Sequence, residues 1–319
     1  MPFLAQALDP ALAQAQLQRV LPQLGPVTVA TLVRHKLGRR ALVAYSAATP
    51  TGPTVLLGKL RAKGTDLASY RVQRTLWESG WAADSPDGLS VPEPLGVVPA
   101  WHMTLQRWVP GPPATQSLAT PQGLVLAPRI AALAHKLHCT PVPTAKVHTL
   151  ADELHILRQR LPLVAQQHPA WAARLDHILT RCQHRAAPFL AAPFPQALPP
   201  TGIHRDFYAD QVLVDGDRLW LVDLDLYCQG SPALDLGNFI AHITEQSLRQ
   251  LGDPGALADR ETALREAFMA LTPHRAEALG AEIELYTLLT LVRHIHISQR
   301  IASRRPYTEA LMALCEARL

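Results

Sequence analysis

One stretch of the chain, residues 201–242, holds the residue types that phosphoryl transfer requires. It opens with His-Arg-Asp at 204–206 and continues to Gln211. Two apolar runs then flank the turn at 215–217 and predict a β-hairpin that ends at Asp223. A carboxylate before such a hairpin can orient an attacking hydroxyl, and one at its end can hold Mg²⁺ on nucleotide phosphates. The spacing therefore predicts phosphotransfer chemistry.

The whole segment resembles the catalytic core of the aminoglycoside phosphotransferase and choline kinase family. The pattern of that family is His-x-Asp-x-x-x-x-Asn, a hairpin, Ile/Val-Asp and then Gly-Asp-Pro-x-x-Asp-Leu-Ala/Gly. The resemblance implies that Asp206 is the catalytic base, that His204 buttresses its loop and that Asp223 binds Mg²⁺. It also implies that Gly230–Pro232 and Asp235–Gly237 support the catalytic loop from below.

Gln211 departs from this pattern, because the family usually has the second metal-binding Asn there. Gln keeps the amide oxygen but places it one methylene further from the backbone. We expect Gln211 to be a weaker second metal ligand, and Asp210 beside it to compete for the ion. Taken alone, His-x-Asp is more typical of a helix-capping turn. The hairpin, Asp223 and Asp235 in the right order favour the kinase-like interpretation.

Three residues are expected on the nucleotide side. Lys59 follows an apolar run in the third predicted strand, and the resemblance implies that it reaches the ATP phosphates; a lysine facing water is the alternative. Gln106 and Trp108 precede a Pro-Gly pair and resemble the family's hinge, whose backbone groups read adenine. A packing role for Trp108 stays open. The acidic helix residue that often pairs with this lysine has no clear counterpart here.

The elements that must position these residues follow from hydrophobic periodicity. Three strands are predicted first, at 27–33, 40–45 and 54–60. A helix at 66–80 and two further short strands at 94–98 and 101–109 follow. Helices are predicted at 5–22, 127–138, 169–187, 235–250, 259–271 and 274–303, and another is predicted to begin at a capping box formed by Thr149 and Asp152. A proline-rich stretch at 188–200 precedes the catalytic segment. We predict an α+β, two-lobed protein-kinase-like fold. Residues 1–109 form a nucleotide-binding lobe with a small antiparallel sheet, and 110–319 a larger, mainly helical lobe with the acceptor site.

Composition bounds the partners. The 319 residues are 48% hydrophobic and 18% charged, as in globular proteins, and carry a net charge of +4. Basic residues are scattered along the chain except at 34–40 and 300–305, so nucleic acid is not an expected partner. The turn at 34–40 is either exposed to solvent or covers the nucleotide. No apolar run is long enough to span a membrane, and the first residues lack a secretory pattern. Four separated cysteines indicate reduced thiols in a cytoplasmic protein, and the histidines form no metal motif. We expect a monomer or a homodimer.

The favoured function is an ATP- and Mg²⁺-dependent kinase that phosphorylates a hydroxyl of a small molecule. Arg and His residues near the end of the last long helix favour a sugar-like or other neutral or anionic acceptor. Two alternatives stay open: a weakly active, nucleotide-binding regulatory pseudokinase, and an aminoglycoside or amino-alcohol kinase. A protein kinase is disfavoured because only eleven residues separate Asp223 from Asp235, too few for an activation loop.

Overall fold

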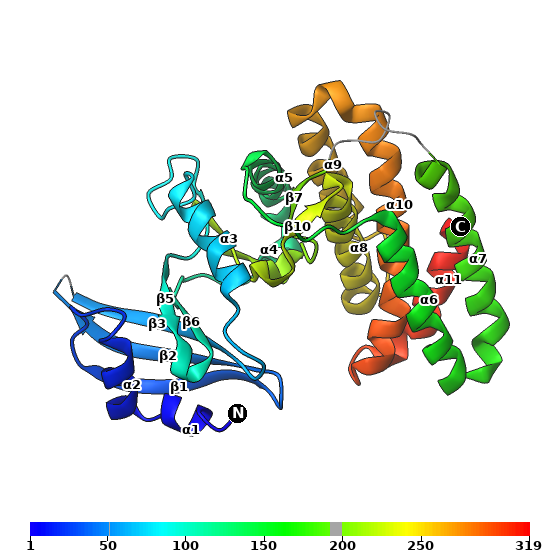
Figure 1. Ribbon diagram of the computed structural model, residues 1–319. Helices are drawn as coiled ribbons and strands as arrows, with labels where there is room; N and C mark the ends of the chain where they lie inside the picture. Colours follow the sequence, from blue (N-terminus) through cyan, green and yellow to red (C-terminus); the bar gives the residue numbers. More distant parts are fainter. Residues whose placement is uncertain (51, 192–199) are drawn as a thin grey trace. The chain divides into compact units, whose positions relative to one another are not determined.

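The computed structural model describes residues 1–50, 52–191 and 200–319. The chain divides into two compact units, which we call the sheet unit and the helical unit (Figure 1). The sheet unit contains Met1–Pro112 and Leu213–Asp225, and the helical unit contains Pro113–Val212 and Leu226–Leu319. Most of the predicted proline-rich stretch falls on 192–199, outside the described residues.

A five-stranded antiparallel sheet, ordered β1-β2-β3-β6-β5, forms the centre of the sheet unit. Its strands are β1 Val27–Lys36, β2 Arg40–Thr49, β3 Gly52–Arg61, β5 Pro94–Val98 and β6 Met103–Arg107. Side chains of β2 alternate between buried and partly exposed, because successive residues of a strand point to opposite faces. The buried face packs with the N-terminal helices in one hydrophobic cluster that includes Tyr45 and Trp101. Helix α3, Leu67–Glu78, follows β3 as predicted.

The N-terminal segment corrects one prediction. The single helix expected over 5–22 is two helices, α1 Leu4–Ala7 and α2 Pro10–Leu17. The break lies at Asp9, whose carboxylate accepts hydrogen bonds from the N–H groups of Ala11 and Leu12. Pro10 then takes the first helical position, where its missing N–H costs nothing.

The predicted hairpin is present as β8 Val212–Asp215 and β9 Arg218–Leu221. The predicted boundary after residue 109 assigned this hairpin to the second domain, whereas the structure groups Leu213–Asp225 with the sheet unit. Strand pairing explains the difference, because β9 lies parallel to β4, Leu89–Ser90. The Arg218 guanidinium strengthens this contact by donating to the Ser90 hydroxyl at 2.6 Å.

The helical unit consists of helices around one small strand pair, β7 Thr201–Ile203 with β10 Cys228–Gly230 (Figure 1). Its helices are α4 Ala114–Leu118, α5 Gly123–Cys139, α6 Leu150–Gln167, α7 Ala172–Ala191, α8 Pro232–Leu251, α9 Ala258–Leu271, α10 Ala276–Arg300 and α11 Thr308–Arg318. The predicted capping box opens α6. Helices α8 and α10 approach closely at Gly237, where an added Cβ would lie 2.7 Å from the Thr287 nitrogen.

All four cysteines are free thiols, as predicted, and three of them are buried. Within the described ranges, no helix combines the length and the apolarity that crossing a bilayer requires.

Candidate active site

The predicted catalytic loop leaves β7 at His204 and is fixed by Asp235 at the start of α8. Asp235 is fully buried, and its two carboxylate oxygens accept the backbone N–H groups of His204 at 2.8 Å and Arg205 at 2.7 Å. The His138 ring, on α5, lies 2.9 Å from the same carboxylate. Arg205 has a φ of +71°, a conformation that non-glycine residues rarely adopt and that clusters at functional sites. The two backbone bonds stabilise this turn.

A second tether holds the loop one residue beyond Asp206. Asn238 donates from its side-chain amide to the Phe207 carbonyl at 2.8 Å. Arg293 on α10 donates to the Asn238 oxygen at 2.5 Å and to the Glu153 carboxylate at 3.0 Å. Burial opposes the charge on Glu153, but Arg293 and a 2.6 Å bond with His148 hold the pKa of that carboxyl below its usual value. The Phe207 end of the loop is therefore tied to a buried ion pair.

The structure places the remaining predicted residues of this loop as follows. Asp206 is half-buried and lies between the two tethers. The His204 ring is buried and lies 6.0 Å from the Phe207 ring. Gln211 is 7% exposed, and its N–H donates to the Tyr208 carbonyl. Asp210, the predicted competitor for the metal, accepts a hydrogen bond from the Thr115 hydroxyl.

In the sheet unit, Asp223 follows β9 with a φ of +61°, a backbone conformation that non-glycine residues rarely adopt. Its carboxyl is hydrogen-bonded to that of Asp225 and lies 3.7 Å from the Arg40 guanidinium. Asp225 pairs with Arg40 at 3.1 Å and also with Arg61. All four side chains are 17–30% exposed, so this group of carboxylates and guanidinium groups is partly open to water.

The two carboxyls of this pair differ in proton affinity. Burial, reinforced by the neighbouring Asp225 charge, raises the pKa of Asp223. Burial also opposes the charge on Asp225, but Lys59, the bond from Asp223 and Arg61 lower the pKa of Asp225 to about 2. A divalent cation would relieve the repulsion that otherwise favours a proton on Asp223.

These oxygen donors fit Mg²⁺, which protein sites usually bind through one or two carboxylates, substrate phosphates and water. No larger cage of three or more His, Cys, Asp or Glu side chains occurs among the described residues.

Lys59 lies on β3, between Leu42 of β2 and Thr104 of β6. Its positive charge acts on both Asp223 and Asp225, so the sheet unit brings Lys59 near Asp223, another predicted residue of this unit. The acids at the two ends of α3 pair with arginines. Asp66 pairs with Arg61 at 3.0 Å, and Glu78 pairs with Arg74 at 3.6 Å.

The predicted hinge residues lie at the end of β6. Gln106 is 5% exposed, and its side-chain oxygen accepts from Gln73 of α3 at 3.2 Å. Trp108 is 41% exposed, but its N–H donates to the Val55 carbonyl at 2.9 Å. The Trp108 ring is therefore available to a ligand, whereas its backbone donor is engaged within the sheet unit.

Several residues of these networks were not predicted. Asp225 and Arg40 had sequence signals, the second acid in Val-Asp-Leu-Asp and the dense basic turn before β2. Asn238, Arg293, Glu153 and His148 had none, because they meet only through the packing of α6, α8 and α10.

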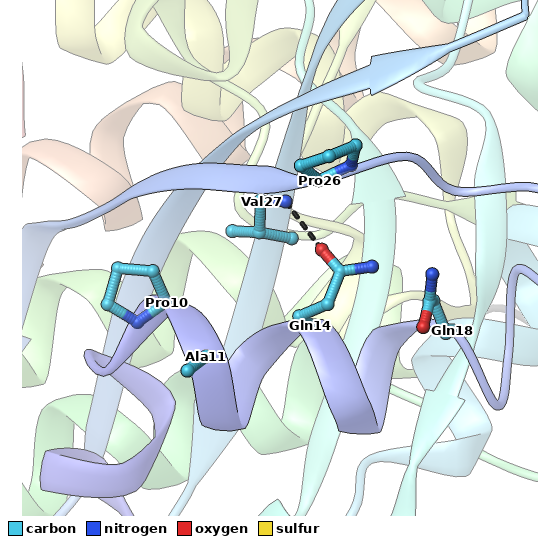
Figure 2. A pocket seen from close by; sticks show the side chains of 6 residues that line it. All are labelled: Pro10, Ala11, Gln14, Gln18, Pro26 and Val27. Atoms are coloured by element: carbon cyan, nitrogen blue, oxygen red, sulfur yellow. Dashed lines mark hydrogen bonds between the residues drawn. The ribbon is translucent and has the colours of Figure 1, made fainter.

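A separate pocket of about 520 Å³ lies beside α2 and β1 in the sheet unit (Figure 2). The Gln14 side-chain oxygen accepts from the Val27 N–H there at 2.5 Å. The lining has no titratable side chain and so offers no acid or base: Pro10, Ala11, Gln14, Gln18, Pro26 and Val27.

The chain is similar to known proteins in sequence and in fold. A sequence model of the phosphotransferase enzyme family matches residues 68–272, more than half of the chain. The fold is similar to that of choline kinase from Cryptosporidium parvum Iowa II, with a TM-score of 0.64 and 10% identity over 99% of this chain and 93% of that chain. It is also similar to spectinomycin phosphotransferase in complex with ADP and spectinomycin, with a TM-score of 0.60 and 13% identity over 95% and 98% of the two chains.

A choline/ethanolamine kinase family protein from Mesorhizobium loti gives a TM-score of 0.57 and 16% identity, covering 96% of this chain and 93% of that chain. No curated protein matches the chain. The predicted α+β kinase-like fold is thus confirmed by structures of very low sequence identity.

Proposed function

This chain belongs to the phosphotransferase enzyme family, and we propose that it transfers the γ-phosphoryl group of ATP, with Mg²⁺, to a hydroxyl of a small molecule. The observation that carries the proposal is the loop at Asp206, which the buried Asp235 and Asn238 fix on both sides. A rigidly held carboxylate suits the alignment of an attacking hydroxyl. ATP is proposed as the donor because the similar spectinomycin phosphotransferase structure contains ADP.

Asp206 is the proposed catalytic residue of the helical unit. It accepts the hydroxyl proton while the hydroxyl oxygen forms a bond to the γ-phosphorus and the bond to the β,γ-bridging oxygen breaks. His204, which is buried and packed beside Phe207, acts by positioning the loop and not by touching the acceptor.

The nucleotide-side residues are proposed to be Lys59, Asp223 and the hinge. Lys59 attracts the phosphates, and the Trp108 ring and the backbone near Gln106 border the base. Asp223 would hold Mg²⁺ with help from Asp225, and Gln211 would supply an amide oxygen as a weaker second ligand. When bound, the ion neutralises negative charge on the transferring phosphoryl group.

The first experiment compares Asp206→Asn with Asp210→Asn, two isosteric losses of charge in the same loop. ADP release is measured against a panel of hydroxyl metabolites, and ATP affinity is measured separately. We expect Asp206→Asn to lower turnover by ~10²–10⁴-fold with little change in ATP affinity. Asp210→Asn removes only the predicted competitor for the ion, so its turnover should equal or exceed that of the wild type. Equal turnover in Asp206→Asn and wild type would exclude Asp206 from the mechanism.

The second experiment addresses the metal and the phosphates. Asp223→Ala should abolish metal-dependent nucleotide binding, and Lys59→Met should raise the ATP concentration needed for half-maximal rate. Gln211→Asn should keep or improve activity, because it restores the shorter amide. If Gln211→Ala has the same dependence on Mg²⁺ concentration as the wild type, Gln211 is not a metal ligand.

A catalytically weak nucleotide-binding protein is the second candidate. The observation that favours it is Arg40, which already pairs with both Asp223 and Asp225 and so competes with a cation. In that case ATP binds, but no acceptor in the panel increases ADP release.

A further inference from the structure

A cluster of basic and imidazole side chains lies directly beyond the catalytic loop in the helical unit. The Tyr208 ring stacks on the His242 ring of α8, with centroids 4.4 Å apart and planes at 21°. The His242 Nε2 atom lies 3.2 Å from Nε2 of His294 on α10. Since Tyr208 is two residues after Asp206, their Cα atoms are at most ~7 Å apart. The imidazole pair is therefore close to the proposed catalytic residue, and the basic side chains follow on α8 and just beyond α10.

Two arginines act electrostatically on this imidazole pair, and the two arginines share a single carboxylate. Glu245, which is 5% exposed, lies 3.0 Å from the Arg249 guanidinium and 3.7 Å from that of Arg304. In the described part of the chain, Glu245 is the one carboxylate within ion-pair distance of either arginine. Two guanidinium charges thus meet one negative charge. Both side chains are only 21–24% exposed, so an uncompensated cation there is poorly solvated.

The two histidines do not add charge of their own. Burial is the main cause that holds the pKa of both rings below the usual histidine value, to about 3 for His294; His294 and then the arginines add to it for His242, and the arginines for His294. Neutral imidazoles provide polar but uncharged groups beside the arginines. The third nearby guanidinium, Arg293, is already matched by Glu153.

The carboxylates that a cationic acceptor would require are engaged elsewhere. Glu245 of α8 is shared by the two arginines. On α10, Glu282 accepts from the Ser231 hydroxyl at 2.7 Å, and Glu284 pairs with Arg265 at 3.0 Å. This cluster therefore favours negative charge in a ligand.

We propose that Arg249 and Arg304 bind the carboxylate or phosphate group of an acidic acceptor whose hydroxyl is directed to Asp206. The inference rests on the proposed function and narrows it to hydroxy acids or hydroxyalkyl phosphates. Tyr208 and His242 form the wall between the anionic group and the reacting hydroxyl, and His294 positions His242. A guanidinium recognises such oxyanions through two parallel N–H donors, which suits this task better than a lysine.

The test compares glycerol with glycerate and glycerol 3-phosphate, which share a backbone and differ in charge. Binding is measured by calorimetry without nucleotide, and phosphoryl transfer by ADP release. The variants are Arg249→Gln, Arg249→Lys and Arg304→Gln, with Arg300→Gln as the matched control because Arg300 is an exposed arginine at the end of α10. Thermal unfolding verifies that each variant is folded.

We expect wild type to prefer at least one anionic probe to glycerol by ~10-fold or more. Arg249→Gln and Arg304→Gln should weaken binding of that probe by ~10- to 100-fold, the usual range for a charge-assisted hydrogen bond. Arg249→Lys should retain part of the affinity, and Arg300→Gln should retain all of it. A preference for glycerate or for glycerol 3-phosphate shows whether the site binds a carboxylate or a phosphate ester.

The proposal is overturned if glycerol is bound and phosphorylated as well as the anions, or if the anion affinity survives the loss of both charges. In the first of these cases the proposed function still holds. If the anions bind in an arginine-dependent way but no probe is phosphorylated, the anion site is supported and the proposed kinase activity is contradicted.

Discussion

Asp223 and Asp235 come from the same short segment of sequence, yet their surroundings are opposite. Asp235 is fully buried and accepts two backbone N–H groups, with a histidine ring 2.9 Å away. The Asp223 side chain is 28% exposed and interacts with Arg40, Lys59 and another carboxyl, all of them side-chain groups. Backbone donors fixed in a turn hold a loop in one conformation. Partly exposed side-chain charges can exchange one partner for another.

Within one sequence motif, Asp235 therefore serves to hold the loop in place, whereas Asp223 is suited to ligand binding. The interactions of Asp235, Asn238 and Arg293 should govern stability as well as activity, because losing any partner leaves a buried polar group unsatisfied. The interactions of Asp223, Asp225 and Arg40 should matter little to stability, because partly exposed ion pairs contribute little.

The largest expected effect is that of Asp235→Asn. The amide keeps the shape but has one acceptor oxygen where the carboxylate has two, so a buried N–H of His204 or Arg205 loses its partner. We expect a loss of about 3–5 kcal/mol in the free energy of unfolding, measured by urea titration. Turnover should fall with it, because the loop at Asp206 loses its anchor.

The control for that variant is Glu284→Gln, the same chemical change at a side chain that is 57% exposed and paired with Arg265. It should cost less than about 1 kcal/mol. Equal losses in the two variants would contradict the distinction between buried and exposed acids.

Much of this fold could be predicted because its signals are local. The alternation in β2 and the Thr149/Asp152 capping box specify their elements within a few residues. The Asp9-Pro10 pair was an equally local signal for the break between α1 and α2, but the apolar periodicity on either side concealed it.

The loop's support was harder to predict because it depends on long-range packing. Asp235 was recognised through its motif, whereas the Arg293–Asn238 bond joins residues 55 positions apart. Nothing in the sequence around Arg293 distinguishes it from Arg300, which is exposed on the same helix. The choice between them depends on which helix face meets Asn238 and Glu153.

A double-mutant cycle on Arg293 and Glu153 examines the second tether. Each single change, Arg293→Met or Glu153→Gln, leaves its partner buried without its counter-charge. We expect losses of about 2–3 kcal/mol for each variant and a coupling energy of about 1–2 kcal/mol. Additive losses in urea titrations would mean that the pair does not act as a unit.

The same pair predicts how stability depends on pH. The pKa of Glu153 is lower in the folded chain than its ordinary value of 4.5, chiefly through Arg293 and His148 acting against burial. At acid pH the unfolded chain therefore binds more protons, and this contribution is present above about pH 4.5 and lost as the pH falls further. The stability difference between wild type and Glu153→Gln should shrink between about pH 6 and pH 3. A constant difference over that range would show that Glu153 does not titrate with unfolding.

The smallest expected effect on stability belongs to Arg40→Gln. Arg40 is 29% exposed and lies 3.1 Å from Asp225 and 3.7 Å from Asp223, so its loss should change the free energy of unfolding by less than about 1 kcal/mol. The same change should tighten binding of Mn²⁺ alone, measured by electron paramagnetic resonance, by ~2- to 5-fold, because a competing positive charge about 4 Å away contributes about 1 kcal/mol in a water-like environment. Measuring the metal without nucleotide excludes any contact of Arg40 with phosphates. Weaker Mn²⁺ binding, or a stability loss as large as that of Asp235→Asn, would show that Arg40 organises the carboxylates instead of competing for them.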